Sequence, residues 1–227
     1  MGSSLRAYVA EFIGTFGFVL AGAGSVCVDA LMPGRLGLTG IALAHGLALA
    51  VMIYTFGPAS GGHFNPAVTA VMLLHRRIGN VSAIIYVALQ LLGAALAGLL
   101  LSSMLKFRPE LIVSAPYLGA CDLTGVGFRM GTLLEAIGTF FVVSAIYATM
   151  LDKKGSPLIG PLAIGSSFAF SLLIFGPLTG SAFNPARSFG PAIVSQHWSH
   201  WYVYWIGPLV GAATASMLQE KIFLDPN

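Results

Sequence analysis

The chain is built from long apolar segments separated by short polar ones. Six of these segments are about 20 residues long or longer, which is the length that a helix needs to cross a bilayer. We therefore expect six membrane-spanning helices, at about 7–28, 38–57, 80–104, 130–150, 157–176 and 201–222. An even number of crossings places both termini on the same side of the membrane.

Two shorter apolar segments, 66–75 and 185–194, cannot cross a bilayer alone. Asn is a strong helix N-cap and Pro is favoured at the first helical position, so an Asn-Pro-Ala tripeptide before each segment predicts the start of a half-helix. Irregular backbone at membrane depth is tolerated only where protein buries it or where it lines a wet cavity. Two half-helices that meet end to end satisfy this condition. The two tripeptides are Asn65-Pro66-Ala67 and Asn184-Pro185-Ala186.

Composition agrees with an integral membrane protein. The chain is 56% hydrophobic and 8% charged, whereas a soluble domain carries about 25% charged residues. The net charge of +3 comes from scattered basic residues, so nothing predicts a nucleic-acid partner. The lipid bilayer is the expected surrounding.

The basic residues favour one orientation. With six spans, the side that holds the termini carries Arg6, Arg76, Arg77, Lys153, Lys154 and Lys221. The opposite side carries Arg35, Lys106, Arg108 and Arg129. Because cytoplasmic loops are enriched in Lys and Arg, this bias predicts that both termini are cytoplasmic. It does not indicate which membrane holds the protein.

The two halves of the chain resemble each other. Three matches carry this repeat: Glu11-Phe12-Ile13-Gly14-Thr15-Phe16 with Glu135-Ala136-Ile137-Gly138-Thr139-Phe140, Gly57-Pro58-Ala59-Ser60-Gly61 with Gly176-Pro177-Leu178-Thr179-Gly180, and Gly93-Ala94-Ala95 with Gly211-Ala212-Ala213. Three spans per half is an odd number, so the second repeat must run inverted relative to the first. We expect one domain, 1–227, with inverted repeats at about 7–104 and 130–222. The fold class is then all-α, with six transmembrane helices and two re-entrant half-helices that enter from opposite faces.

Cysteine spacing and catalytic motifs add little. Cys27 lies in an apolar run, where a buried thiol is expected, and Cys121 falls in a polar loop, where it can be accessible. The spacing of these two cysteines matches neither a disulfide framework nor a metal site. No motif for nucleotide, metal or covalent chemistry is present, so we expect no enzyme activity, cofactor or metal.

The two loops resemble the signature loops of the major intrinsic protein family, the aquaporins and aquaglyceroporins. The resemblance covers essentially the whole chain and is carried most closely by Ser60-Gly61-Gly62-His63-Phe64-Asn65-Pro66-Ala67-Val68-Thr69 and Phe183-Asn184-Pro185-Ala186-Arg187-Ser188. It implies six tilted helices and two half-helices around one pore per subunit, usually in a homotetramer. The expected permeants are water and small neutral solutes.

The resemblance also implies which residues line the pore. The outer selectivity filter maps to His45, Leu172, Ser181 and Arg187. Backbone carbonyls of Gly61, Gly62, His63 and Phe64 line one half, and those of Gly180, Ser181 and Ala182 line the other. A fixed arginine in such a pore excludes protons and cations electrostatically.

The paired tripeptides suggest how protons are excluded at the centre. Each half-helix N-terminus carries the equivalent of about half a positive charge, and Asn65 and Asn184 each present a side-chain NH₂ donor. A permeating water that accepts from both turns its own hydrogens outward. That orientation breaks the continuous donor chain on which proton hopping depends.

The filter residues bear on the substrate. Many water-selective relatives have an aromatic residue at the position of His45 and a His at that of Leu172, whereas this chain has His, Leu and a small Ser181. This combination resembles plant tonoplast intrinsic proteins, some of which pass ammonia as well as water. Glycerol-selective relatives usually carry Asp where this chain has Ser188. We therefore expect a passive water channel that also admits ammonia or other small neutral solutes, with a glycerol or polyol facilitator as the alternative.

Two acids lie within predicted spans, Glu11 and Glu135. Intramembrane acids are functional candidates, and a proton-coupled secondary transporter would need such groups. Their equivalent positions in the repeat favour a different role. Each glutamate can accept hydrogen bonds from the backbone of a re-entrant loop and hold that loop in place.

Overall fold

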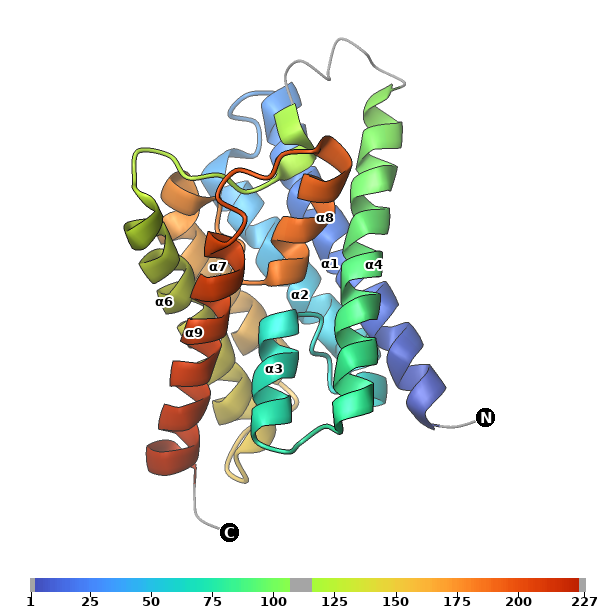
Figure 1. Cartoon of the computed structure of the whole chain (residues 1–227), viewed down its shortest axis with the longest axis vertical. Helices are drawn as coiled ribbons and strands as arrows, with labels where there is room; N and C mark the ends of the chain where they lie inside the picture. Colours follow the sequence, from blue (N-terminus) through green and yellow to red (C-terminus); the bar gives the residue numbers. More distant parts are fainter. Residues whose placement is uncertain (1–2, 107–115, 225–227) are drawn as a thin grey trace.

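The structure is a computed structural model, and it describes residues 3–106 and 116–224 as a bundle of helices (Figure 1). Every regular element in these ranges is helical, which confirms the predicted all-α class. The long helices are α1 (Ser3–Leu31), α2 (Gly37–Ser60), α4 (Asn80–Lys106), α6 (Phe128–Ile146), α7 (Gly160–Thr179) and α9 (Val203–Leu218). The short helices are α3 (Pro66–Leu74) and α8 (Pro185–Ser195), with a 3-10 turn η1 (Pro116–Gly119) and two π turns, η2 (Tyr147–Leu151) and η3 (Gln219–Phe223).

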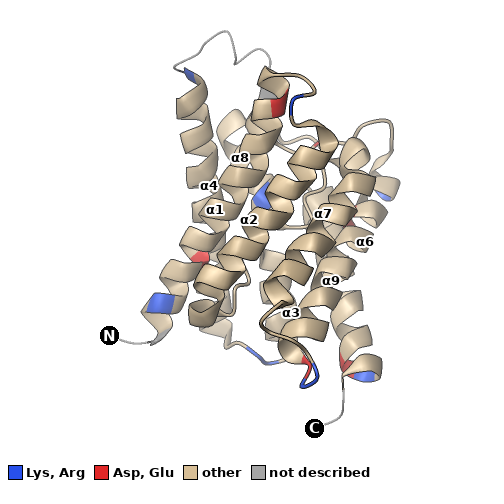
Figure 2. Ribbon diagram, turned by 180° about the vertical axis from the view of Figure 1, so that it is seen from behind, with Lys and Arg blue, Asp and Glu red and all other residues tan. Residues whose placement is uncertain are grey.

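The long helices suit a membrane. Five of them, α1, α2, α4, α6 with its π turn, and α7, are long and apolar enough to cross a bilayer. Helix α9 has 16 residues and continues into the 5-residue turn η3, so together they span about 30 Å at about 1.5 Å per residue. Lys, Arg, Asp and Glu gather mainly at the two ends of the bundle (Figure 2). The protein is therefore an integral, multi-pass membrane protein.

The two half-helices begin where the tripeptides predict. Pro66 and Pro185 occupy the first turns of α3 and α8, and the preceding asparagines are extended N-caps whose side chains accept backbone N–H bonds. The two helices leave their meeting point in opposite directions, α3 toward the end of the bundle where the chain termini lie and α8 toward the other end (Figure 1). Neither crosses the molecule.

Equivalent helices make equivalent contacts in the two halves. Helix α1 packs on α2 and α4, and α6 packs on α7 and α9. Each half-helix also packs on a long helix of the other half. Helix α3 packs on α9 as well as on α4, and α8 packs mainly on α4. Helices α2 and α7 form the remaining large contact between the halves.

Helices α2 and α7 run further than the sequence predicts. Their expected ends were 57 and 176, but both helices continue through a proline, Pro58 or Pro177, to Ser60 and Thr179. Each ends at a glycine in the left-handed region, with φ 88° at Gly61 and 73° at Gly180. The N–H groups of these glycines bond the carbonyls of Gly57 and Gly176 at 2.8 and 2.9 Å. A left-handed C-cap stops each helix, because glycine adopts that conformation without a Cβ penalty.

Candidate functional site

The two re-entrant loops are joined at the tips of the half-helices by reciprocal hydrogen bonds. The Nδ2 atom of Asn65 donates to the carbonyl oxygen of Phe183 at 3.0 Å, and Nδ2 of Asn184 donates to that of Phe64 at 2.8 Å. Each Oδ1 atom caps its own helix, accepting from the N–H of Ala67 or Ala186 at 2.9 Å. With Oδ1 committed to the cap, each amide must direct its NH₂ group outward from its own helix.

These contacts leave one amide hydrogen on each asparagine. Both side chains line the same narrow passage of about 10 Å³, which is close to the smallest volume that holds one water. Apolar side chains, among them Phe18, Val142 and Phe168, form much of its remaining wall. Two donors therefore converge on a passage that offers few other partners.

A larger cavity of about 240 Å³ continues from this passage. The two share the lining residues Ile53, Gly62, His63, Val68, Ile146 and Ile164. The larger cavity extends to Arg77, Met150 and Leu151. Of the residues expected to supply lumen carbonyls, Gly61, Gly62 and His63 lie here. The carbonyl oxygen of Phe64 instead accepts the bond from Asn184.

The carboxylate of Glu11 lies fully buried against the first re-entrant loop. Its Oε1 atom accepts from the hydroxyl of Ser60 at 2.7 Å and from the N–H of His63 at 2.9 Å. Its Oε2 atom accepts from the N–H of Phe64 at 2.8 Å and from Nε2 of Gln90 at 2.7 Å. All of these groups donate hydrogen bonds to the carboxylate. These bonds replace the water that the buried acidic group has lost.

Glu135 holds the second re-entrant loop in the same way. Its carboxylate accepts from the hydroxyl of Thr179 at 2.7 Å and from the N–H groups of Ala182 and Phe183 at 3.1 and 2.7 Å. The sequence reasoning missed the two hydroxyl donors, Ser60 and Thr179. Their equivalent positions in the repeat, each immediately before a glycine cap, were a signal that could have identified them.

The phenylalanine rings of the two loops are seated on glycines. A Cβ atom added to Gly14 would fall on the ring of Phe64, and one added to Gly138 would fall on the ring of Phe183. Both rings are fully buried. Each glycine lies three residues after its glutamate, on the same face of α1 or α6. On that face the glutamate binds the backbone of the adjoining loop, and the glycine makes room for the phenylalanine ring of the loop.

Arg187 lies in the first turn of α8 and is 1% exposed. Its Nη1 atom donates to the carbonyl oxygen of Gly119 at 3.0 Å and to the Sγ atom of Cys121. Its Nη2 and Nε atoms lie 3.2 and 3.4 Å from Nε2 of His45. Among the residues that the structure describes, no carboxylate pairs with this guanidinium.

The hydrogen bonds of His45 define its tautomer. Its Nδ1 atom lies 2.9 Å from the carbonyl oxygen of Ile41, which can only accept, so Nδ1 carries the hydrogen. In the neutral ring Nε2 is then the acceptor for Arg187. Both ring nitrogens are committed, and the ring itself stacks on Phe168 with centroids 5.7 Å apart.

The other two expected filter residues, Ser181 and Leu172, are also buried. The Oγ atom of Ser181 has no hydrogen-bond partner within the described part of the chain, and its backbone is left-handed with φ 49°. Leu172 packs in the apolar cluster that contains Phe168. The structure thus brings His45 directly to Arg187, while the bonds of Arg187 do not involve Ser181 or Leu172.

The two cysteines are both buried. This confirms the expectation for Cys27, but Cys121 is 4% exposed, so the idea that its polar loop makes it accessible is wrong. Its loop folds inward because the buried guanidinium of Arg187 needs acceptors. Burial raises the pKa of the Cys121 thiol to about 12. The protonated thiol can donate to the carbonyl oxygen of Gly180, 3.6 Å away, while its sulfur accepts from Arg187.

Taken together, the fold and the site define a helical membrane channel in which two half-helices meet at buried asparagines. Comparisons with known proteins agree. The family model of the major intrinsic protein matches residues 2–219. Aquaporin TIP4-4 of Zea mays is 42% identical over 226 residues, covering 97% of this chain and 87% of the relative. The probable aquaporin TIP3-2 of Arabidopsis thaliana is 42% identical over 236 residues, covering 97% and 85%. The chain belongs to the major intrinsic protein family.

A solved structure shows the same fold. The aquaglyceroporin from Plasmodium falciparum superposes with a TM-score of 0.81, at 20% identity, and the match covers 96% of each chain. At that identity the likeness concerns the arrangement of the helices alone.

Proposed function

We propose that this protein is a passive channel for water, with ammonia or other small neutral solutes as further permeants, and that it excludes protons and ions. The observation that carries the proposal is the pair of amide donors, Asn65 and Asn184, which converge on a narrow, largely apolar passage continuous with the inner cavity. The pore then belongs to one domain, 1–227, formed by two inverted repeats.

The charge distribution supports exclusion of ions. A cation at the tips would face two helix N-termini, each equivalent to about half a positive charge. It would also face Arg187, whose hydrogen-bond partners are His45, Gly119 and Cys121 rather than an acid. A water that accepts the free hydrogen of each asparagine turns its own hydrogens away from the centre, which interrupts proton hopping.

The filter contacts favour small neutral permeants over polyols. Both nitrogens of His45 are occupied, so the polar groups left for a permeant are the Ser181 hydroxyl and the remaining N–H of Arg187. Leu172 contributes an apolar surface. A polyol that enters the filter would lose the water bound to several of its hydroxyl groups at once. This site offers too few hydrogen-bond partners to replace that water.

The contacts of the two buried acids argue against a proton-coupled transporter. Glu11 accepts four hydrogen bonds and Glu135 accepts three, and most of the donors belong to the re-entrant loops. A proton carrier needs a carboxylate that can exchange its partners with water. These contacts suit a fixed support for the loops.

Orientation and assembly follow from the same proposal. The chain termini lie at one end of the bundle (Figure 1). We place that end in the cytoplasm because the loops beside it carry more of the basic residues; Arg108, one of the four assigned to the other side, lies outside the described residues. The family resemblance supports a homotetramer with one pore in each subunit.

Stopped-flow light scattering on purified protein in vesicles tests the function. Water, ammonia and glycerol gradients are applied in turn, with empty vesicles as the control. We expect water flux well above the control, measurable ammonia flux, and glycerol flux at the control level. Water flux equal to that of empty vesicles would refute the channel, and flux that follows an imposed proton gradient would favour the transporter.

A further inference from the structure

The segment 117–122, which we call the outer strap, supplies half of the contacts that hold Arg187. Gly119 offers its carbonyl oxygen at 3.0 Å and Cys121 its sulfur, and both accept from Nη1 of the guanidinium. The remaining contacts come from His45. The position of the guanidinium in the filter therefore depends on where the strap lies.

The strap does not hold this shape through its own backbone preference. Tyr117, Leu118 and Gly119 are consecutive left-handed residues, with φ of 61°, 55° and 73°. Residues other than glycine rarely adopt this conformation, because Cβ crowds the carbonyl oxygen. Contacts from outside the strap must therefore keep it in place.

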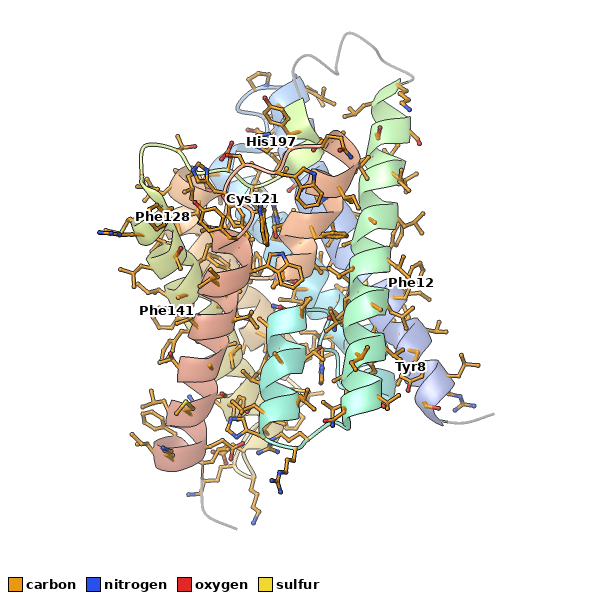
Figure 3. The ribbon with its side chains drawn as sticks, viewed as in Figure 1. Tyr8, Phe12, Cys121, Phe128, Phe141 and His197 are labelled. Atoms are coloured by element: carbon orange, nitrogen blue, oxygen red, sulfur yellow. The ribbon has the colours of Figure 1, made fainter. Side chains whose placement is uncertain are left out.

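One side chain contacts both ends of the strap. The ring of His197 stacks on the ring of Tyr117, with centroids 3.8 Å apart and planes at 19°. Its Nε2 atom donates to Oδ2 of Asp122 at 2.8 Å. His197 and Cys121 lie at the same end of the molecule, beside the upper part of α8 and α9 (Figure 3).

His197 is also tied to the helix that carries Arg187. Helix α8 ends at Ser195, and the N–H of His197 bonds the carbonyl oxygen of Ala192 at 3.1 Å. Arg187 lies in the first turn of this same helix. The helix therefore presents the guanidinium at one end and the residue that clamps its acceptors at the other.

Asp122 is a suitable partner for this clamp. Partial burial alone would raise its pKa, but hydrogen bonds from Ser199, the N–H of Leu123, His197 and His200 outweigh that effect and lower the pKa below its ordinary value. The side chain is therefore an anion at neutral pH. The second histidine, His200, lies further away, with Nδ1 3.5 Å from Oδ1 of Asp122, and its side chain is 42% exposed.

We propose that His197 is a positioning residue for the selectivity filter: by clamping Tyr117 and Asp122, it holds the Gly119 and Cys121 acceptors over Arg187 and so sets the ratio of ammonia to water permeation. The inference rests on the proposed channel function. When the clamp is lost, the packing of Leu118 and Cys121 still holds the middle of the strap, but its two ends are released and the bonds from Nη1 to Gly119 and Cys121 weaken. The group then turns toward the lumen, where water satisfies it.

The test compares His197→Ala with the unchanged protein in vesicles, measuring water and ammonia permeability on the same preparations. A guanidinium in the lumen narrows the filter, so we expect both permeabilities to fall and the ammonia-to-water ratio to fall by about threefold or more, near the low end of the coupling between contacting residues. A loss of folded protein would reduce both fluxes equally and leave the ratio unchanged. The ratio therefore reports on the filter rather than on yield.

Three further variants sharpen the result. Asp122→Ala should reproduce the shift. His197→Gln keeps an N–H donor for Asp122 but loses the ring that stacks on Tyr117, so it should restore only part of the original ratio. His200→Ala is the matched control and should leave the ratio unchanged, since it contacts only one end of the strap.

An unaltered ratio in His197→Ala, or an equal shift in His200→Ala, would overturn the inference while the channel function stood. Absence of water flux in the unchanged protein would instead refute the proposed function itself.

Discussion

The side-chain amide of Asn184 donates to the backbone carbonyl of Phe64 at 2.8 Å, although the two residues are 120 positions apart. The reciprocal bond joins Asn65 to Phe183. Each asparagine therefore caps its own half-helix and holds the opposite loop. The two loops are therefore joined to each other where α3 and α8 begin.

Asn184→Asp keeps the helix cap but removes the hydrogen bond between the two loops. The carboxylate still accepts from the N–H of Ala186, but it cannot donate to Phe64 and it adds a negative charge at the tip. That charge exceeds the roughly half positive charge of the helix end. We expect proton conductance per channel to rise about tenfold or more. A tenfold rise corresponds to lowering the free-energy barrier to proton passage by about 1.4 kcal/mol.

Proton leak measured with an entrapped pH dye, normalised to water flux, checks this prediction. The control is Asn184→Ala, which loses both the cap and the bond to Phe64 but adds no charge. A leak no greater in the Asp variant than in the Ala variant would contradict the electrostatic account of proton exclusion.

Leu172→His tests the assignment of the filter. Leu172 is 2% exposed and lies in the same apolar cluster as Phe168, and a histidine there would add a polar group to the apolar side of the filter. We expect ammonia flux to fall relative to water flux, by about threefold, which corresponds to a barrier change of under about 1 kcal/mol. The measurement is the ratio of the two fluxes in vesicles. Leu172→Met keeps the apolar volume and should leave the ratio as it was; an unchanged ratio in the His variant would count against the placement.

Glu135→Gln tests the support of the second loop. Three donors converge on the Glu135 carboxylate, from Thr179, Ala182 and Phe183, and an amide would set its own NH₂ against at least one of them. We expect the free energy of unfolding to fall by about 1–3 kcal/mol, the cost of an unsatisfied buried donor. Thermal unfolding of the protein in detergent measures the change.

The control for this substitution is Glu220→Gln. Glu220 pairs with Arg77 at 2.7 Å, but the two side chains are 27% and 35% exposed, and a solvated pair of this kind contributes about 0–1 kcal/mol. Equal losses of stability in Glu135→Gln and Glu220→Gln would show that the buried carboxylate is not a specific support.

Gly138→Ala tests the seat of the Phe183 ring. The added methyl would fall on that ring, and the loop cannot retreat because Glu135 and Asn65 hold its backbone. We expect a loss of about 1–3 kcal/mol from overpacking. Adding Phe183→Leu should recover part of the loss, as seen in the thermal midpoint. Strictly additive effects would mean that the two residues do not share the contact.

Several elements of the fold were predictable because the bilayer constrains them strongly. Apolar runs of about 20 residues located the spans, and the Asn-Pro pairs located the starts of α3 and α8. The ends of α2 and α7 were harder to predict: the expected ends, 57 and 176, each fall one residue before a proline that the helix passes through, Pro58 or Pro177. The helices end instead where a left-handed glycine is needed, at Gly61 and Gly180.

The site was predictable only in part. The repeat singled out Glu11 and Glu135, because matched acids in two spans required a shared explanation. Their partners were harder to identify: Gln90 is 79 residues from Glu11, and it has no acidic or motif signature. Cys121, 66 residues from Arg187, was expected at an accessible position and is buried against the guanidinium.

The sequence by itself determined the long helices, the two half-helices with their caps, and the family. These depend on local patterns: the length of apolar runs, the residue before a proline, and the repetition of short motifs. Tertiary structure alone decided which acceptors each buried donor finds. A buried amide or guanidinium must be satisfied by whichever group the packing of distant segments brings within about 3 Å. For Asn184 that group is the carbonyl of Phe64, and for Arg187 it is His45 together with Gly119 and Cys121 of the outer strap.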